Sequence, residues 1–366
     1  MVFDLDDFLK KSHKAQASDI HLNCDKSPSL RINGEIYKIV SDVVTYQDIQ
    51  NILDKTLPQV YRAKVSELQD IDYIYEIKGL SRYRVNYCKE LHYGKFTFRA
   101  IPYNIKPIES LGLPEYLKEY TNFNNGIVFV TGATGSGKST TLSSMIETIN
   151  QNHKRHIITI EDPVEFVYED KKSIITQRSL DIDVQDFKTG IKYALRQDPD
   201  VILVGEIRDK ETLLSAIEAS ETGHLVFSTL HTNGTVASIN RLKGFIDEAS
   251  QDQFMKRLAN CIRGVVHQQL VPTTNDGVLV PAVEILTFTS TVVDYIKDGK
   301  FHDVELLMQK SKQQNIKTMN ASLYELYENG KITKETAIEY SLEKVEMEQM
   351  LRGIYRNTGV DESILY

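Results

Sequence analysis

Residues 126–149 are GIVFVTGATGSGKSTTLSSMIETI, and this stretch decides the fold. A β-prone apolar run comes first, then a loop rich in glycine, then a helical pattern. The loop holds Gly132-x4-Gly137-Lys138-Ser139, which is the P-loop spacing in the strand–loop–helix context that this motif requires. The sequence therefore predicts a phosphate-binding loop in an α/β domain. The alternative, a chance glycine-rich turn, does not explain the flanking strand and helix.

Each residue type in this loop suits a phosphate. Glycine lacks a Cβ, so backbone N–H groups can turn inward around the β-phosphate. We expect Lys138 to reach the β- and γ-phosphates and the Ser139 hydroxyl to ligate Mg²⁺. The following helix directs its positive end at the same anion. The predicted nucleotide-binding residues are Gly132, Ala133, Thr134, Gly135, Ser136, Gly137, Lys138, Ser139 and Thr140.

Outward from this loop, apolar runs alternate with helical patterns. After the first strand, the expected strands are HIITIE (156–161), VILVG (201–205) and HLVFSTL (224–230). Such nearly continuous apolar runs are typical of buried parallel strands, and helices between them imply βαβ units. One more strand is expected over residues 277–286, followed by helices to residue 366.

Acidic residues follow two of these strands. Glu161, Asp162 and Glu165 stand at the carboxyl end of the second, and Glu206 follows the third. Ligands bind at that edge of open parallel sheets. A carboxylate there can hold Mg²⁺, and one near the γ-phosphate can orient or deprotonate the attacking water. Some of these acids are expected to be solvated, but Glu206 directly follows a buried strand and is the stronger candidate for a functional residue.

Two histidines bracket the fourth strand. His224 and His231 are separated by roughly 20 Å if the strand rises ~3.3 Å per residue, so they cannot both touch one γ-phosphate. His231 is at the carboxyl end, where it can hydrogen-bond a phosphate oxygen or the attacking water. His224 is expected to be a strand-end or subunit-contact residue. A lone histidine at a strand end is more often structural, so the pattern alone leaves the role of His231 open.

Residues 1–103 have the pattern of a small α+β domain. Asn33-Gly34 lies between two β-rich arms and suits a two-residue hairpin turn that needs positive φ. Residues 104–120 contain two prolines and little sheet character. We expect them to be a linker with a short helix.

One sheet face of this domain is expected to carry arginines. Alternation along SRYRVNY (81–87) puts Arg82 and Arg84 on one face, and Arg99 lies on the polar face of the strand KFTFRAI (95–101). A solvated polar face is the alternative interpretation.

The bulk composition is that of a globular protein. The chain has 366 residues, 41% hydrophobic and 26% charged, so two or three domains are expected. No run reaches the ~18 apolar residues of a membrane span, and the N-terminus lacks a signal-peptide core. The cysteines are Cys24, Cys88 and Cys261, with no CxxC pair, which favours a reducing compartment over disulfides or zinc. A net charge of −8 argues against direct nucleic-acid binding.

Four ordered motifs resemble those of the type IV pilus retraction ATPases of the secretion ATPase superfamily. The matching stretches are GATGSGKSTT (132–141) for the Walker A motif, TIEDPVEF (159–166) for the aspartate box, DPDVILVGEIRD (198–209) for the atypical Walker B motif and TGHLVFSTLHT (222–232) for the histidine box. ASDIHL near the start, residues 241–272 and GKITKETAIEYS in the tail also fit. The resemblance therefore covers nearly the whole chain.

The resemblance implies an α/β fold class with a RecA-like P-loop ATPase domain. Its expected parts are a PAS-like N-terminal α+β domain (1–103), a linker (104–120), the RecA-like domain (121–285) and a C-terminal helical region (286–366). It implies that Glu165 is the general base, that Glu206 supports Mg²⁺ and that His231 contacts the γ-phosphate of ATP.

The resemblance also implies an assembly. The chain would form a cytoplasmic homohexamer at the periphery of the inner membrane. It would turn a membrane platform protein and so withdraw pilin from the fibre base. In such rings the N-terminal domain packs on the ATPase domain of the next subunit. Arg84 and Arg99, and after them Arg82, would then act as arginine fingers on a neighbour's nucleotide.

The sequence favours retraction over extension, with one departure. Relatives that drive pilus assembly or type II secretion usually carry an extra N-terminal region and a four-cysteine zinc insert. Retraction enzymes typically carry an AIRNLIREGK segment, whereas residues 291–303 here are TVVDYIKDGKFHD. The GKxH ending survives and the two arginines do not, which concerns the coupling to pilus disassembly rather than the ATPase.

Other functions remain open at this point. One is a pilus extension, type II secretion or DNA-transfer motor of the same superfamily. Another is an ATP-gated assembly scaffold that barely hydrolyses ATP, against which Glu165 and Glu206 argue. A small-molecule kinase would need an acceptor-binding lid, and the sequence has no recognisable one.

Overall fold

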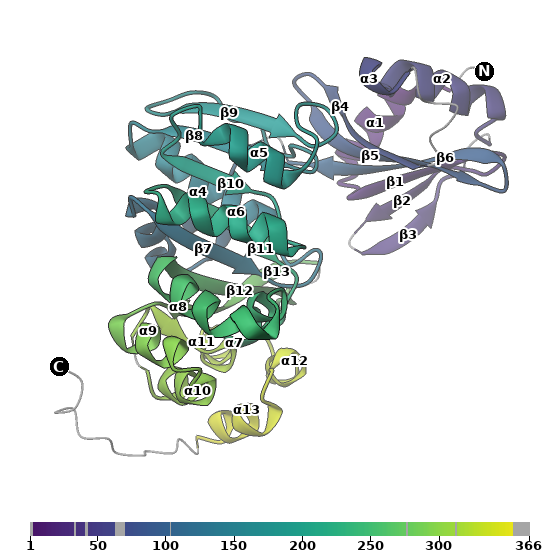
Figure 1. Ribbon diagram of the computed structural model, residues 1–366. Coiled ribbons are helices and arrows are strands. Elements are labelled where there is room, and N and C mark those ends of the chain that lie inside the picture. The colour runs from purple at the N-terminus through teal and green to yellow at the C-terminus, as the bar shows by residue number, and fades with distance from the viewer. Residues whose placement is uncertain are drawn as a thin grey trace. The chain divides into compact units, whose positions relative to one another are not determined.

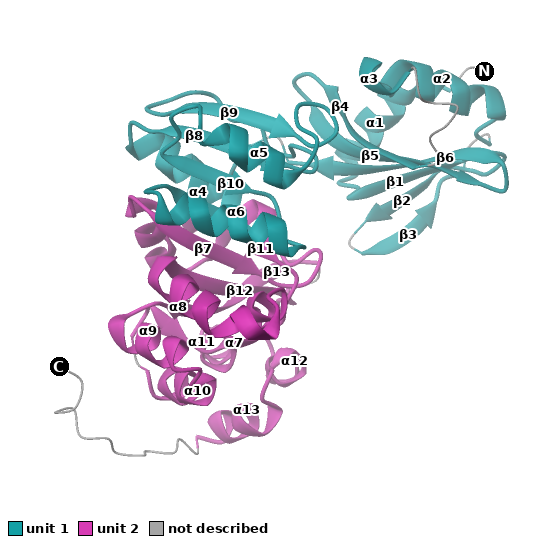
Figure 2. Cartoon of the chain, viewed as in Figure 1, with its two compact units in different colours: residues 1–107, 142–228 teal, residues 108–141, 229–366 magenta. Residues whose placement is uncertain are grey.

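The structure is a computed structural model that describes residues 3–32, 34–40, 43–62, 70–102, 104–275, 277–311 and 313–353. The chain forms two compact units. Unit 1 contains residues 1–107 and 142–228, and unit 2 contains residues 108–141 and 229–366 (Figure 2). The chain passes between them near residue 107, inside helix α4 (Lys138–Asn152) and inside strand β11 (Leu225–Leu230).

The N-terminal part of unit 1 is a six-stranded antiparallel sheet with helices packed on one face (Figure 1). The strand order is β3-β2-β1-β6-β5-β4. In chain order its elements are α1 (Leu5–Lys14), β1 (Asp19–Asn23), β2 (Ser29–Ile32), β3 (Glu35–Lys38), α2 (Tyr46–Thr56), α3 (Gln59–Arg62), β4 (Asp70–Ile77), β5 (Ser81–Glu90) and β6 (Tyr93–Ile101).

Local sequence explains these elements. Helix α2 begins with a capping box in which Thr45 and Asp48 each satisfy the other's backbone N–H. Strand β5 alternates buried and partly exposed residues, and its buried face packs against α1 and α2. At the predicted hairpin, β2 and β3 are paired and Gly34 has a φ of +87°. Asn33, the other predicted turn residue, lies outside the described residues.

The second part of unit 1 is a parallel sheet with the strand order β11-β10-β8-β9. Strands β10 and β11 are fully buried, as are the four inner residues of β8, which is why they are mostly apolar. The strands are β8 (His156–Glu161), β9 (Ile174–Ser179) and β10 (Val201–Val204), and the helices after β9 are α5 (Phe187–Ala194) and α6 (Lys210–Glu221). Strand β9 is partly exposed and polar, and the sequence did not reveal it.

Unit 2 contains the glycine-rich loop and the C-terminal helices. Its strands lie in the order β14-β13-β12-β7, with β12 parallel to β7 and antiparallel to β13. They are β7 (Gly126–Thr131), β12 (Ile262–Pro272), β13 (Leu279–Thr287) and β14 (Ile316–Lys317). The helices are η1 (Ile108–Leu111), η2 (Glu115–Asn122), α7 (Thr235–Gly244), η3 (Glu248–Ser250), α8 (Gln251–Cys261), α9 (Ser290–Lys297), α10 (Phe301–Lys310), α11 (Met319–Glu328), α12 (Lys334–Tyr340) and α13 (Lys344–Leu351).

A buried carboxylate joins two helices of unit 2. Oε1 of Glu284, in β13, accepts hydrogen bonds from the backbone N (2.7 Å) and hydroxyl (2.8 Å) of Thr235. Its Oε2 accepts from the backbone N of Met319 at 3.2 Å. Thr235 and Met319 are the first residues of α7 and α11. One negative charge therefore meets the positive ends of both helices.

The Gly264 position should tolerate no side chain. A Cβ there would lie 2.4 Å from the Tyr120 hydroxyl, and the fully buried Tyr120 is held by a 2.6 Å hydrogen bond to Thr287. We expect Gly264→Ala to lower the free energy of unfolding by about 1–3 kcal/mol, measured by urea denaturation. Gly244→Ala is the matched control, because nothing lies within 4 Å of its added Cβ. Equal stability of the two variants would contradict this packing.

Candidate functional site

In unit 2 the loop between β7 and α4 bends at its glycines. Gly132, Gly135 and Gly137 have φ values of +144°, +82° and +87°, which side chains rarely adopt. Nζ of the buried Lys138 donates to the carbonyl oxygens of Gly132 (2.9 Å) and Ala133 (3.0 Å). The ammonium group is therefore held by the loop backbone at the start of α4, where the helix end favours an anion.

Strand β12 supports this loop from within unit 2. Gln268 Nε2 donates to the carbonyl oxygen of Ser136 (2.7 Å), and Gln268 Oε1 accepts from the Thr141 hydroxyl (2.7 Å). A Cβ at Gly132 would lie 2.4 Å from the Gln268 carbonyl oxygen, and one at Gly137 would lie 2.7 Å from Gln268 Nε2. Close contact with β12 thus requires glycine at both positions, a reason beyond the access of phosphate to the backbone that the sequence suggested.

The loop also fits a phosphate by its hydrogen-bonding groups. Ser136 Oγ is buried and has no hydrogen-bond partner in the described part of the chain. Together with the Lys138 ammonium and the start of α4, it supplies the donors that phosphate oxygens accept.

A buried histidine lies next to this loop. His267, in β12, is fully buried and its Nδ1 is 3.3 Å from the Thr131 hydroxyl. Burial lowers the pKa of His267 to about 4, and the nearby Lys138 charge acts in the same direction. The imidazole is therefore neutral at physiological pH.

In unit 1 the loop after β8 carries Glu165, and two predicted arginines contact it. Arg84 Nη1 is 3.6 Å from Glu165 Oε1, and Arg82 Nη1 donates to the Glu165 carbonyl oxygen at 2.5 Å. The Arg84 guanidinium also lies 3.8 Å from an oxygen of Asp72. Both arginines therefore contact the predicted base of their own chain. Their predicted action on a neighbouring subunit stays a prediction.

The third predicted arginine has another partner. Arg99 lies directly opposite Arg84 in the β5–β6 pairing, so the two side chains share a sheet face as the alternation suggested. Arg99 Nε donates to Asp19 Oδ1 at 2.8 Å. Asp19 is buried, and burial raises its pKa, but its bonds to Arg99 and Ser18 outweigh that effect and hold the pKa below the ordinary value.

Two further acids precede Glu165. Burial raises the pKa of Glu161 to about 7, and the Glu165 charge adds to the rise. One carboxylate oxygen of Glu161 is buried without a hydrogen-bond partner among the described residues. Burial also raises the pKa of Asp162, with Arg84 opposing and the charges of Asp181 and Glu206 assisting. The carboxyl ends of β8 and β10 thus bring several acidic side chains together.

Glu206 lies beside this group. Val204 pairs with Ile160 in adjacent parallel strands, and Gly205 donates its N–H to the Ile160 carbonyl oxygen at 2.8 Å. Glu206 comes next, and its Oε1 is 2.6 Å from Arg208 Nη2. The predicted position after a buried strand is therefore the observed one.

The two histidines bracket β11. His224 precedes the strand, and its Nδ1 lies 2.9 Å from the Ala219 carbonyl oxygen and 3.2 Å from the Thr222 hydroxyl. His224 therefore links the end of α6 to the start of β11 by hydrogen bonds. His231 follows the carboxyl end of the strand and is exposed.

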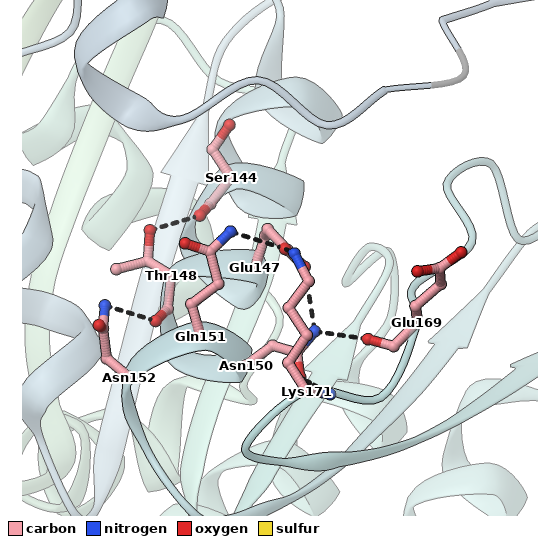
Figure 3. Close-up of polar contacts among 8 residues, drawn as sticks. All are labelled: Ser144, Glu147, Thr148, Asn150, Gln151, Asn152, Glu169 and Lys171. Carbon is pink, nitrogen blue, oxygen red and sulfur yellow. Dashed lines mark hydrogen bonds and ion pairs between the residues drawn. The ribbon is translucent and has the colours of Figure 1, made fainter.

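Beyond Glu165, the connection to β9 contacts helix α4 through Glu169 and Lys171, as Figure 3 shows. Asn150 Nδ2 donates to the carbonyl oxygen of Glu169 (2.8 Å), and Asn150 Oδ1 accepts from the backbone N of Lys171 (3.1 Å). The Lys171 ammonium pairs with Glu147. Burial raises the pKa of Glu147, but Lys171 and the amides of Gln151 and Asn150 outweigh it and hold the pKa below its ordinary value.

Sequence reasoning missed several of these residues. Gln268 and His267 lie in HQQ within an apolar stretch, and a polar residue in a buried strand is a usable signal. Asn150, near the end of α4, gives no comparable signal.

Neither a metal-binding group nor a membrane-spanning helix is found among the residues that the structure describes. Within them, no group of three or more His, Cys, Asp or Glu side chains is arranged to hold a metal ion. None of the helices described is long and apolar enough to cross a bilayer.

Comparison with known sequences places the chain in context. The family model described as type II/IV secretion system protein matches residues 2–356. The chain is 34% identical to the type IV pilus retraction ATPase PilT of Pseudomonas aeruginosa, over 92% of this chain and 97% of that protein. It is 35% identical to a twitching motility protein of Neisseria gonorrhoeae, over 85% of this chain and 83% of that protein.

A solved structure agrees with these sequences. The crystal structure of the pilus retraction motor PilT with bound ADP matches with a TM-score of 0.88 and 37% identity, covering 95% of this chain and all of that chain. The likeness confirms the predicted α/β fold class, with a RecA-like ATPase domain and a C-terminal helical region.

The raised pKa of Glu161 predicts a pH-dependent stability. A carboxyl group with a pKa of about 7 in the folded state binds more protons when folded, so its ionisation costs stability as the pH rises from about 4.5 through 7. We expect the free energy of unfolding of Glu161→Gln, relative to that of the wild type, to increase between about pH 5 and pH 8 by up to about 3 kcal/mol. Urea denaturation at both pH values measures the difference. A gain equal at both pH values would contradict the buried, ionising carboxyl group.

Proposed function

Because this chain belongs to the type II/IV secretion system protein family, we propose that it is a homohexameric ATPase motor that powers type IV pilus retraction. It converts ATP and water to ADP and phosphate. The observation that carries the proposal is an intact P-loop, with Lys138 held inside it, in a chain whose full-length relatives include a pilus retraction ATPase.

The nucleotide and its metal have residues that suit them. The loop from Gly132 to Thr140 holds the phosphates of ATP through its backbone N–H groups and Lys138. The exposed Ser139 hydroxyl and Glu206 are the proposed Mg²⁺ ligands, the latter through a water. When bound, Mg²⁺ neutralises charge on the phosphate oxygens.

Glu165 is the proposed general base and His231 a proposed γ-phosphate contact. A carboxylate accepts the proton of the attacking water as the water becomes a nucleophile. In the structure this carboxylate faces Arg84, so we propose that Arg84 leaves Glu165 when it turns to a neighbour's nucleotide. Arg99 and Arg82 are the further candidates for arginine fingers.

The assembly follows from the proposed function. Linker residues 104–120 separate an N-terminal domain (1–103) from the ATPase domain (121–285), and phosphate release changes the angle at this hinge. Six chains act in turn on an inner-membrane platform protein at the cytoplasmic base of the pilus, and pilin is withdrawn indirectly.

The segment 291–303, which departs from the retraction pattern, spans parts of α9 and α10 with a turn where Lys300 pairs with Asp298 at 2.8 Å.

The general base assignment has a direct test. Glu165→Gln removes the proton acceptor but keeps the shape, so turnover should fall by at least about 1,000-fold while ATP still binds. Phosphate release and equilibrium binding of a fluorescent ATP analogue measure the two properties. Lys138→Ala, which removes the phosphate contact, is the comparison and should lose binding. Hydrolysis by Glu165→Gln at a near wild-type rate would end the assignment.

The direction of the motor is tested in cells. Deleting the gene should leave cells hyperpiliated and unable to twitch, because pili still assemble and no longer retract. A wild-type copy should restore twitching, and a Glu165→Gln copy should not. Piliation is scored by electron microscopy and motility by colony spreading. Bald cells would indicate an extension motor instead.

A further inference from the structure

The connection from β8 to β9 is unusual for parallel strands. Such connections normally contain a helix, which satisfies its own backbone groups. Residues 162–173, which form this connection and include Glu165, contain no helix. Their backbone groups need other partners, and these partners determine where Glu165 stands.

Strand β9 supplies partners for the loop backbone on both sides of Glu165. Gln177 Nε2 donates to the carbonyl oxygen of Phe166 at 2.7 Å, and Gln177 Oε1 accepts from the backbone N of Tyr168 at 3.0 Å. Two residues along β9, the Ser179 hydroxyl accepts from the backbone N of Val164 at 3.1 Å. The loop backbone is thus fixed on both sides of Glu165 by side chains of one strand.

The register explains why Gln177 reaches both groups. It lies opposite Thr159 in the parallel β8–β9 pair, so it stands on the strand next to the one from which the loop emerges. It is half-buried, and one carboxamide carries both the donor and the acceptor that a strand neighbour would otherwise supply. A carboxylate, a shorter amide or an apolar side chain at this position cannot make both bonds.

The far end of the loop has separate anchors. Asn150 of α4 holds Glu169 and Lys171, and Glu147 holds the Lys171 side chain (Figure 3). These contacts lie four or more residues beyond Glu165. They fix the return to β9, whereas Glu165 itself is contacted by Arg82, by Arg84 and, at its backbone, by Glu161, with the β9 contacts on either side.

We propose that Gln177 is a positioning residue for the hydrolytic reaction: its carboxamide, bound to the backbone at Phe166 and Tyr168, holds Glu165 at the place from which it takes the proton of water. The proposal rests on the proposed function, because it assumes that Glu165 is the base. A misplacement of about 1 Å can cost 100-fold in rate, which is the sensitivity that makes such a residue matter.

The first test compares Gln177→Ala with wild type in the full chain. We expect kcat to fall about 10- to 100-fold, with the KM for ATP and the affinity for a fluorescent ATP analogue within about twofold of wild type, because the P-loop contacts are unchanged. Retention of wild-type kcat would overturn the proposal. A parallel loss of nucleotide affinity would overturn it too, since that marks a general structural role.

The second test uses Gln177→Glu, which keeps the shape. An ionised carboxyl group accepts from Tyr168 N but repels the Phe166 carbonyl oxygen, whereas the protonated group can donate to it. We expect the kcat of this variant relative to wild type to rise by at least about fivefold from about pH 8 to about pH 5.5. Gln177 also hydrogen-bonds Glu161, whose pKa is about 7, so both proteins are assayed in a Glu161→Gln background, where the ratio at each pH cancels the remaining titrations common to the two.

Controls separate this proposal from the proposed function. Gln185→Glu puts the same charge on an exposed residue and should show a flat ratio across this pH range. If the kcat of Gln177→Glu relative to wild type is also independent of pH, the proposal is overturned. This holds even if Gln177→Ala does not fold. Glu165→Gln is assayed alongside: full activity there refutes the base assignment, while an inactive Glu165→Gln with a fully active Gln177→Ala refutes only the positioning role.

Discussion

Backbone polar groups in a loop that leaves a buried strand need hydrogen-bond partners, and in this chain side-chain carboxamides provide them. Gln268 joins the glycine-rich loop to Thr141, Gln177 holds the loop that carries Glu165, and Asn150 holds that loop's return. Each amide has both a hydrogen-bond donor and an acceptor, so it can make the hydrogen bonds that the backbone of a neighbouring strand would otherwise make. Loops without regular structure are fixed in this way close to Lys138 and Glu165, the residues proposed to bind phosphate and to activate water.

The charges around Glu165 show a second constraint. Glu161 and Asp162 are both shifted toward the protonated form by burial, while Arg82 and Arg84 approach Glu165 from the N-terminal sheet. Arg84 lies 3.6 Å from the Glu165 carboxylate and so also directs that side chain. The sequence alone allowed the arginine face to be either a solvated surface or a functional one. In the structure, Arg82 and Arg84 of this face contact Glu165 of the same chain.

The sequence predicted most of what depends on pattern. The buried runs that became β7, β8, β10 and β11, the alternation along β5 and the bends of the glycine-rich loop all follow from local residue types. Strands β9 and β12 were missed, because β9 is polar and half-exposed and β12 carries buried His267 and Gln268 within an apolar run. The contacts of Gln177 and Asn150 could not be predicted, since they join segments whose proximity only the fold creates.

Glu284 carries a last consequence. Its two oxygens serve the first residues of α7, which follows His231 by a short turn, and of α11 in the C-terminal region. If α11 moved away, one carboxylate oxygen and one helix start would lose their partners in a buried place, which is costly. The two helices are therefore expected to move together. A displacement of the C-terminal region would then be transmitted to the residues next to His231.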